Sequence, residues 1–273
     1  MSTFSRSWNL VKASWNVLSA DKELIVFPII SAFALIAVMI VFAVPGFILY
    51  SAGNNEILGY VLLFLFYLAQ YTVIIFANSA LVGAAMIRLR GGDPTVGDGF
   101  QIAFSRIGAI FGYALIASTV GIILQALSER GVIGNIVRSI IGTAWSIATY
   151  LVVPVLVVEN VGPIEAVKKS ASLLKRTWGE QLAGGAGMGF VFFLFFLLAT
   201  ALAGAGIFLG LMLDMTALVI AFGVFGVIEY IILALISSTL GGIYSAAVYR
   251  YAAEGQVGQQ FAPELIQNAF RAK

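Results

Sequence analysis

Residues 162–182 read GPIEAVKKSASLLKRTWGEQL, a polar and basic stretch in a chain that is otherwise mostly apolar. On one side lies IATYLVVPVLVV (147–158), and on the other lies GFVFFLFFLLATALAGAG (189–206). Four basic residues fall in the polar stretch: Lys168, Lys169, Lys175 and Arg176. Basic residues in a short connection between two apolar spans mark the cytoplasmic side of a membrane protein. The stretch therefore predicts both a membrane location and an orientation.

The composition supports this location. Soluble domains carry about 25% charged residues, whereas this chain carries 10% and is 61% hydrophobic. It has no cysteine and no histidine, which excludes disulfides, thiolate metal sites and the commonest general base. A net charge of only +2, without a basic tail, argues against a nucleic-acid partner. We therefore expect a protein that is not an enzyme and needs no cofactor or metal.

Six apolar stretches exceed the length of about 20 residues that a helix needs to cross the hydrocarbon core. They cover residues 23–50, 57–88, 104–127, 132–158, 181–213 and 216–250. The predicted fold is all-α, a single polytopic membrane domain (1–273) with six transmembrane helices. Several stretches are longer than the minimum, which predicts tilting or kinks at Pro28, Pro45 or Pro154.

The basic residues divide unequally between the two sides when the six spans alternate in direction. One side collects thirteen of them: Arg6, Lys12, Lys22, Arg88, Arg90, Arg106, Lys168, Lys169, Lys175, Arg176, Arg250, Arg271 and Lys273. The other side keeps Arg130 and Arg138. This bias predicts that both termini are cytoplasmic. We expect a multi-pass protein of a prokaryotic cytoplasmic (inner) membrane, since no organelle signal is visible.

Apolar side chains recur at helical spacing within the opening stretch, at Ile164, Val167, Ala171, Leu174 and Trp178. Similar patterns cover residues 3–20, 96–107 and 262–271, and they predict amphipathic helices lying in the cytoplasmic interface. The predicted lipid-interface residues are Trp8, Trp15, Lys168, Lys169, Lys175 and Arg176, and the predicted partners are anionic lipid headgroups. The alternative is that these charges set the topology and nothing more.

An internal repeat is indicated by two similar span endings. The second span ends GAAMIRLR (83–90) and the sixth ends SAAVYRYA (245–252), which superposes Arg88 on Arg250. We infer three parallel units, each an interfacial helix followed by a helical hairpin. The match is incomplete, because the fourth span lacks this ending and the apolar faces are two residues out of register when Pro94 is aligned with Pro163.

Four segments carry a resemblance to a known family: SWNLVKASWNVLSADKELIVFPIIS (7–31), GDPTVGDGFQIAFSRIG (92–108), VGPIEAVKKSASLLKRTWGE (161–180) and IYSAAVYRYA (243–252). The chain resembles an uncharacterised family of prokaryotic integral membrane proteins with six helices. Its layout is also similar to the membrane domain of some glycerophosphoryl diester phosphodiesterases. The resemblance implies a six-helix membrane fold and transfers no catalytic residue.

Polar groups within the spans are the candidate functional residues. Arg138 and Glu229 lie at similar depth near the outer edge of the hydrocarbon, so we predict an ion pair between spans four and six. The alternative is that each reaches the outer headgroups separately. Gln70 and Asn78 on span two could line a solute path or form hydrogen bonds between helices. The GGAGMG segment (184–189) is read as close helix packing rather than as a phosphate loop.

The candidate carboxylates near the inner surface are Asp21, Glu23, Asp93 and Asp98, too few oxygen ligands at a defined spacing for a metal site. The leading hypothesis is a lipid-interacting scaffold or accessory subunit that binds a membrane-protein partner or a second copy of the chain. The alternative hypothesis is a small-solute channel or transporter, and a lipid-modifying enzyme is the third.

Overall fold

The computed structural model describes residues 3–52, 56–178 and 188–267. Over these residues the chain is helical, with no strand. Six helical segments of the described chain are long and apolar enough to cross a membrane, and they correspond to the six expected spans. The prediction of an all-α polytopic membrane fold is confirmed.

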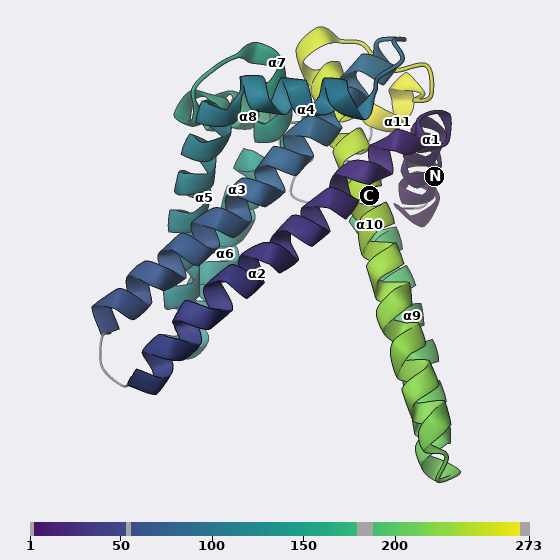
Figure 1. Ribbon diagram of the computed structural model, residues 1–273. Helices are drawn as coiled ribbons and strands as arrows, with labels where there is room; N and C mark the ends of the chain where they lie inside the picture. Colours follow the sequence, from purple (N-terminus) through teal and green to yellow (C-terminus); the bar gives the residue numbers. More distant parts are fainter. Residues whose placement is uncertain (1–2, 53–55, 179–187, 268–273) are drawn as a thin grey trace.

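The spans form three hairpins in chain order (Figure 1). They are α2 (Val26–Ala52) with α3 (Glu56–Leu89), α5 (Ile107–Ser128) with α6 (Gly131–Thr149) and α7 (Val152–Glu159), and α9 (Gly189–Met212) with α10 (Thr216–Glu254). The helix bounds agree with the expected spans except at α9, which is described from residue 189. The GGAGMG segment lies mostly outside the described residues.

Shorter helices gather at one end of the hairpins (Figure 1). They are α1 (Thr3–Ala20), the 3-10 helix η1 (Lys22–Ile25), α4 (Val96–Ser105), α8 (Pro163–Trp178) and α11 (Pro263–Gln267). An amphipathic helix therefore precedes each hairpin, which is the order that the repeat predicts. The expected C-terminal helix is described only to Gln267. We call these helices and their connections the basal layer.

Most of the apolar face of α8 turns into the protein rather than into lipid. On α8 the buried side chains include Ala166, Leu173, Leu174 and Trp178. The Trp178 side chain is 3% exposed, and its Nε1 donates a hydrogen bond to the carbonyl of Ile266 over 3.3 Å. Leu174 and Trp178, two of the apolar positions from which an interfacial helix was predicted, are therefore covered by protein.

Helix α4 lies tightly across α3. A Cβ atom on Gly99 would come within 2.4 Å of the Phe27 ring and 2.7 Å of the Ala80 carbonyl oxygen. The next residue, Phe100, places its ring 5.3 Å from that of Phe27 and 6.1 Å from that of Phe76. Only glycine permits this approach of the two backbones.

The fourth span is broken between α6 and α7. Pro154 lacks an amide hydrogen and its ring clashes with the carbonyl four residues earlier, at Tyr150, where α6 is capped. The Leu151 N–H, freed by the break, donates to the buried hydroxyl of Ser170 on α8 over 3.0 Å. A backbone donor at membrane depth needs such a partner. The kink expected at Pro154 is confirmed, whereas α2 continues through Pro45.

The buried core lies at the basal end of the hairpins. It includes most of residues 75–89 on α3 and 239–252 on α10. These two helices pack closely, since a Cβ on Gly242 would lie 2.4 Å from Leu81 Cδ2. Beyond this crossing the hairpins α2–α3 and α9–α10 diverge (Figure 1), and large apolar side chains such as Phe47 and Phe208 are exposed.

Candidate functional site

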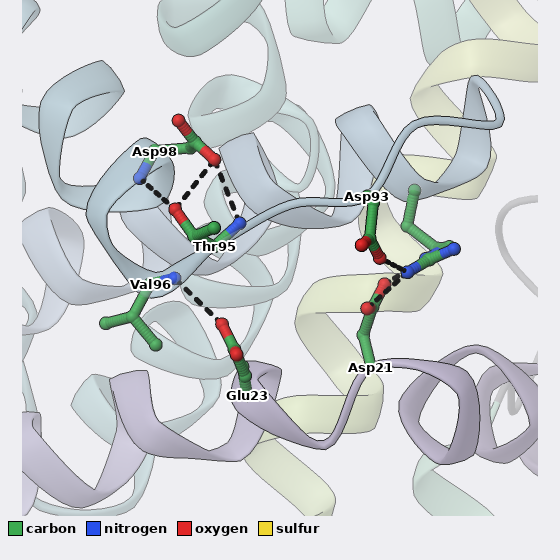
Figure 2. Close-up of polar contacts among 7 residues, drawn as sticks. Asp21, Glu23, Asp93, Thr95, Val96 and Asp98 are labelled. Carbon is green, nitrogen blue, oxygen red and sulfur yellow. Dashed lines mark hydrogen bonds and ion pairs between the residues drawn. The ribbon is translucent and has the colours of Figure 1, made fainter.

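The carboxylates of the basal layer surround one arginine. Asp21, before η1, and Asp93, after α3, both form ion pairs with the guanidinium of Arg88 at the end of α3 (Figure 2). The Asp21 side chain is 7% exposed and that of Arg88 is 20% exposed. The three residues therefore tie the start of the first hairpin to its end.

The other two candidate carboxylates hold the start of α4 (Figure 2). The Asp98 carboxylate accepts hydrogen bonds from the Thr95 backbone N–H over 2.9 Å and from its hydroxyl over 2.7 Å, in a capping box. The same bonds hold the pKa of the Asp98 carboxyl below its usual value. Glu23 accepts from the Val96 N–H over 3.1 Å. The described residues contain no acidic cluster that could hold a metal ion, and all four carboxylates have structural partners.

Arg250, at the position that the repeat equates with Arg88, joins the third hairpin to the first. Its guanidinium donates to the carbonyl of Leu89 and lies 3.3 Å from Glu254. Glu254 in turn forms an ion pair with Arg90. The two matched arginines thus share a role in the basal layer, although their partners differ.

The four basic residues of α8 fall into two pairs. Lys169 forms an ion pair with Glu159, and Arg176 donates to the carbonyl of Ala252 over 3.1 Å. Lys168 and Lys175 are exposed, and neither has an ion pair within the described part of the chain. Two of the four predicted lipid contacts are therefore held by protein, and two remain available.

The tryptophans of α1 differ in the same way. Trp8 is half-buried, with its ring 6.2 Å from that of Phe195 on α9 and the Lys12 ammonium 5.6 Å from its centroid. Trp15 is 47% exposed. Only Trp15 is placed as a lipid-interface residue requires.

Arg138 and Glu229 are not brought together. Both residues are described, and no ion pair joins them. Glu229 is half-buried on α10, with its Oε2 atom buried and without a hydrogen-bond partner. Arg138 is exposed on α6 and lines a cavity between the hairpins. The predicted pair is therefore wrong, because α9 and α10 diverge from the second hairpin at this depth (Figure 1).

This cavity has a volume of about 1120 Å³ and is lined by residues of α3, α5, α6, α8, α9 and α10. Pockets for small molecules have volumes of roughly 300–1,000 Å³. Neither Gln70 nor Asn78 lines it. On α3 that role falls to Tyr67 and Tyr71, and the Tyr67 hydroxyl donates to Gln125 on α5 over 2.9 Å. This cavity therefore does not support the solute-path reading of Gln70 and Asn78.

The polar wall of the cavity is one face of α6. Asn135, Ser139, Gly142 and Ser146 follow each other at steps of three or four residues, Arg138 lies next to Ser139, and all five line the cavity. The other face carries exposed apolar side chains, at Val132, Ile133, Ile136 and Ile140. An amphipathic pattern inside a span is the signal that could have located this wall.

Tyr244 of α10 closes the cavity toward the basal layer. Its side chain is 4% exposed, its ring lies 6.5 Å from that of Tyr150, and its hydroxyl has no hydrogen-bond partner. Gly241, one turn away, also lines the cavity, and a Cβ there would meet nothing within 4 Å. The two adjacent glycines of α10 therefore have different neighbours. Gly241 faces the cavity, and Gly242 packs against α3.

Comparison with known proteins adds a family. Residues 57–260 match a family described as "Family of unknown function (DUF6159)". No curated protein and no solved structure matches the chain. The resemblance to an uncharacterised membrane protein family holds at this level, and the likeness to the phosphodiesterase membrane domain stays a prediction.

Replacement of Arg88 by Met should destabilise the protein by about 2–4 kcal/mol, because it leaves the buried Asp21 carboxylate without a counter-charge. Arg90→Met, two residues away, is the matched control: its ion pair with Glu254 is more exposed, and its loss should cost about 1 kcal/mol or less. Thermal unfolding in detergent measures both. Equal losses would contradict a special role for Arg88.

Proposed function

The chain belongs to the family of unknown function DUF6159, and we propose that it is a non-enzymatic membrane protein that passes a small solute across the bilayer. The sequence alone favours a lipid-interacting scaffold, and the cavity between the hairpins favours the alternative. Its lining extends from Asn135, near the outer turn of the second hairpin, to Leu174 of the basal layer. This extent is the observation that carries the proposal.

The rise per residue of an α-helix converts the extent of this lining into a length along the membrane normal. Asn135 follows the start of α6 by four residues, hence by ~6 Å at a rise of 1.5 Å per residue. At the other end, Tyr244 precedes Arg250 by six residues, or ~9 Å. The hydrocarbon core is about 30 Å thick. The lined space therefore covers much of the membrane thickness, as a solute path requires.

The lack of enzymatic activity is part of the proposal. The four carboxylates that the sequence offers near the inner surface are occupied in the basal layer by Arg88, Thr95 and the Val96 N–H. A general acid or base must be within reach of a reacting group. The cavity lining offers hydroxyl, amide and guanidinium groups instead, which suit binding.

The orientation follows from the charges. The basal layer carries the basic residues of α8 and the ends of α3 and α10, whereas Arg130 and Arg138 lie near the turn between α5 and α6. The positive-inside rule favours a cytoplasmic basal layer. We propose a prokaryotic cytoplasmic membrane as the location, with both termini inside.

Contact with anionic lipid is a second proposed property, favoured by Lys168 and Lys175. These exposed lysines lie on one short helix at the membrane surface, and their ammonium groups are not engaged by acidic residues of the described chain. Each cation near an anionic leaflet contributes about 1 kcal/mol. Binding to a partner protein or a second copy remains compatible with either property.

Filling the cavity should stop the flux. Gly241→Phe places a ring where a Cβ meets open space, so we expect loss of solute efflux from proteoliposomes tested with glycerol, glutamate, phosphate and choline. Gly223→Phe is the matched control, because Gly223 also lies on α10 in open space but does not line the cavity. Absence of flux for all four probes in the unmodified protein would refute the transport proposal.

Cysteine labelling should report the orientation, because the chain has no cysteine of its own. A cysteine at exposed Ser172 on α8 should react with an impermeant maleimide only after the cells are opened. A cysteine at exposed Glu129, in the turn after α5, should react in intact cells. The reverse pattern would invert the proposed topology.

Neutralising Lys168 and Lys175 to Gln should weaken the preference for phosphatidylglycerol over phosphatidylcholine by about fivefold per lysine. Fluorescence quenching by brominated lipids measures this preference. Lys22→Gln, at an exposed lysine outside α8, is the control for general loss of charge. An unchanged preference in the double variant would leave these lysines with a topological role alone.

A further inference from the structure

The charge on the described lining of the cavity is positive. Arg138 is the one charged residue among those that line it in the described chain, and the lining contains no carboxylate. The arginine lies seven residues into α6, ~10 Å from its outer end. An ionisable side chain within a span marks a binding site or a pathway more often than a packing contact.

Arg138 is also uncompensated. No acidic residue of the described chain forms an ion pair with it, and its cavity neighbours on α6 are Asn135 and Ser139, which are neutral. A charge in surroundings of low polarity interacts more strongly with an opposite charge than it would in water. The electrostatic field inside the cavity therefore favours an anion near Arg138.

A second observation, at the other end, is independent of this charge. Tyr244 lines the cavity with a side chain that is 4% exposed, and its hydroxyl is buried without a hydrogen-bond partner. A buried polar group without a partner is rare in native proteins and costs stability. An acceptor oxygen of a bound molecule would complete this site.

We propose that the cavity selects small organic anions that carry carboxylate or phosphate oxygens, with Arg138 supplying the charge near one end and Tyr244 a hydrogen bond at the other. This inference rests on the proposed function, because it names the class of solute that the path admits. Acceptor oxygens suit the hydroxyls and amides of the lining, including Gln125 and Ser146. The same chemistry is present in a free anion and in the headgroup of an anionic lipid.

Two measurements on the full chain test whether the charge of Arg138 selects anions. In proteoliposomes, the ratio of glutamate to choline efflux should exceed one and should fall to about one in Arg138→Gln. In detergent, phosphate, glutamate or phosphatidylglycerol should raise the Tm of the unmodified protein, and this shift should be lost in the variant. Arg130→Gln is the matched control, because Arg130 is exposed near the same turn but does not line the cavity.

Tyr244→Phe separates a binding role from a structural one. The substitution keeps the ring and removes only a hydroxyl that has no partner, so the Tm without anion should stay the same or rise. The Tm shift caused by the anion should become smaller. A lower Tm without anion, with the shift unchanged, would show that the hydroxyl serves packing and would overturn its part of the inference.

The outcomes distinguish this inference from the proposed function. Flux without anion preference, or equal preference in Arg138→Gln and the unmodified protein, overturns the inference and leaves transport standing. No flux for any probe refutes transport. A Tm shift with phosphatidylglycerol but not with phosphate or glutamate identifies a lipid headgroup as the source of the anion, whereas the opposite result identifies a free solute.

Discussion

The close crossing of α3 and α10 is the contact on which the rest of the architecture depends. Gly242 brings α10 against Leu81 on α3, and Arg250 then reaches the carbonyl of Leu89 at the helix end. On one side of this point the basal layer surrounds both helices, and on the other side the hairpins separate (Figure 1). The cavity occupies part of the space that this divergence creates.

The basal layer shows how an apolar chain uses its few charges. Arg88 and Arg250 end two different spans, and each binds groups from other elements, Asp21 and Asp93 in one case and the backbone of α3 in the other. The four carboxylates that could have suggested catalysis, Asp21, Glu23, Asp93 and Asp98, thus form contacts within the basal layer. The described lining of the cavity, in contrast, carries neutral polar groups and one arginine.

The sequence predicted the spans well because hydrophobic length and charge asymmetry are local and additive along the chain. It predicted the break at Pro154 because proline removes a specific hydrogen bond. It could not predict that Trp178 is covered by α11 or that Arg138 and Glu229 stay apart, since both depend on how hairpins meet in three dimensions. The polar face of α6 was visible in the spacing of Asn135 to Ser146, but apart from Arg138 its residues are uncharged and gave a weaker signal than Glu229.

The diverging outer halves of the hairpins have a consequence for the surrounding bilayer. Their exposed phenylalanine, leucine and isoleucine side chains leave acyl chains to fill the wedge between α2–α3 and α9–α10. In a bilayer, lateral pressure and acyl-chain order around these diverging ends would act on the angle between the hairpins, while the basal layer joins their other ends. Lipid becomes a structural element of this protein, and a thicker or more ordered membrane should hold the hairpins in a different relation from a thin and fluid one.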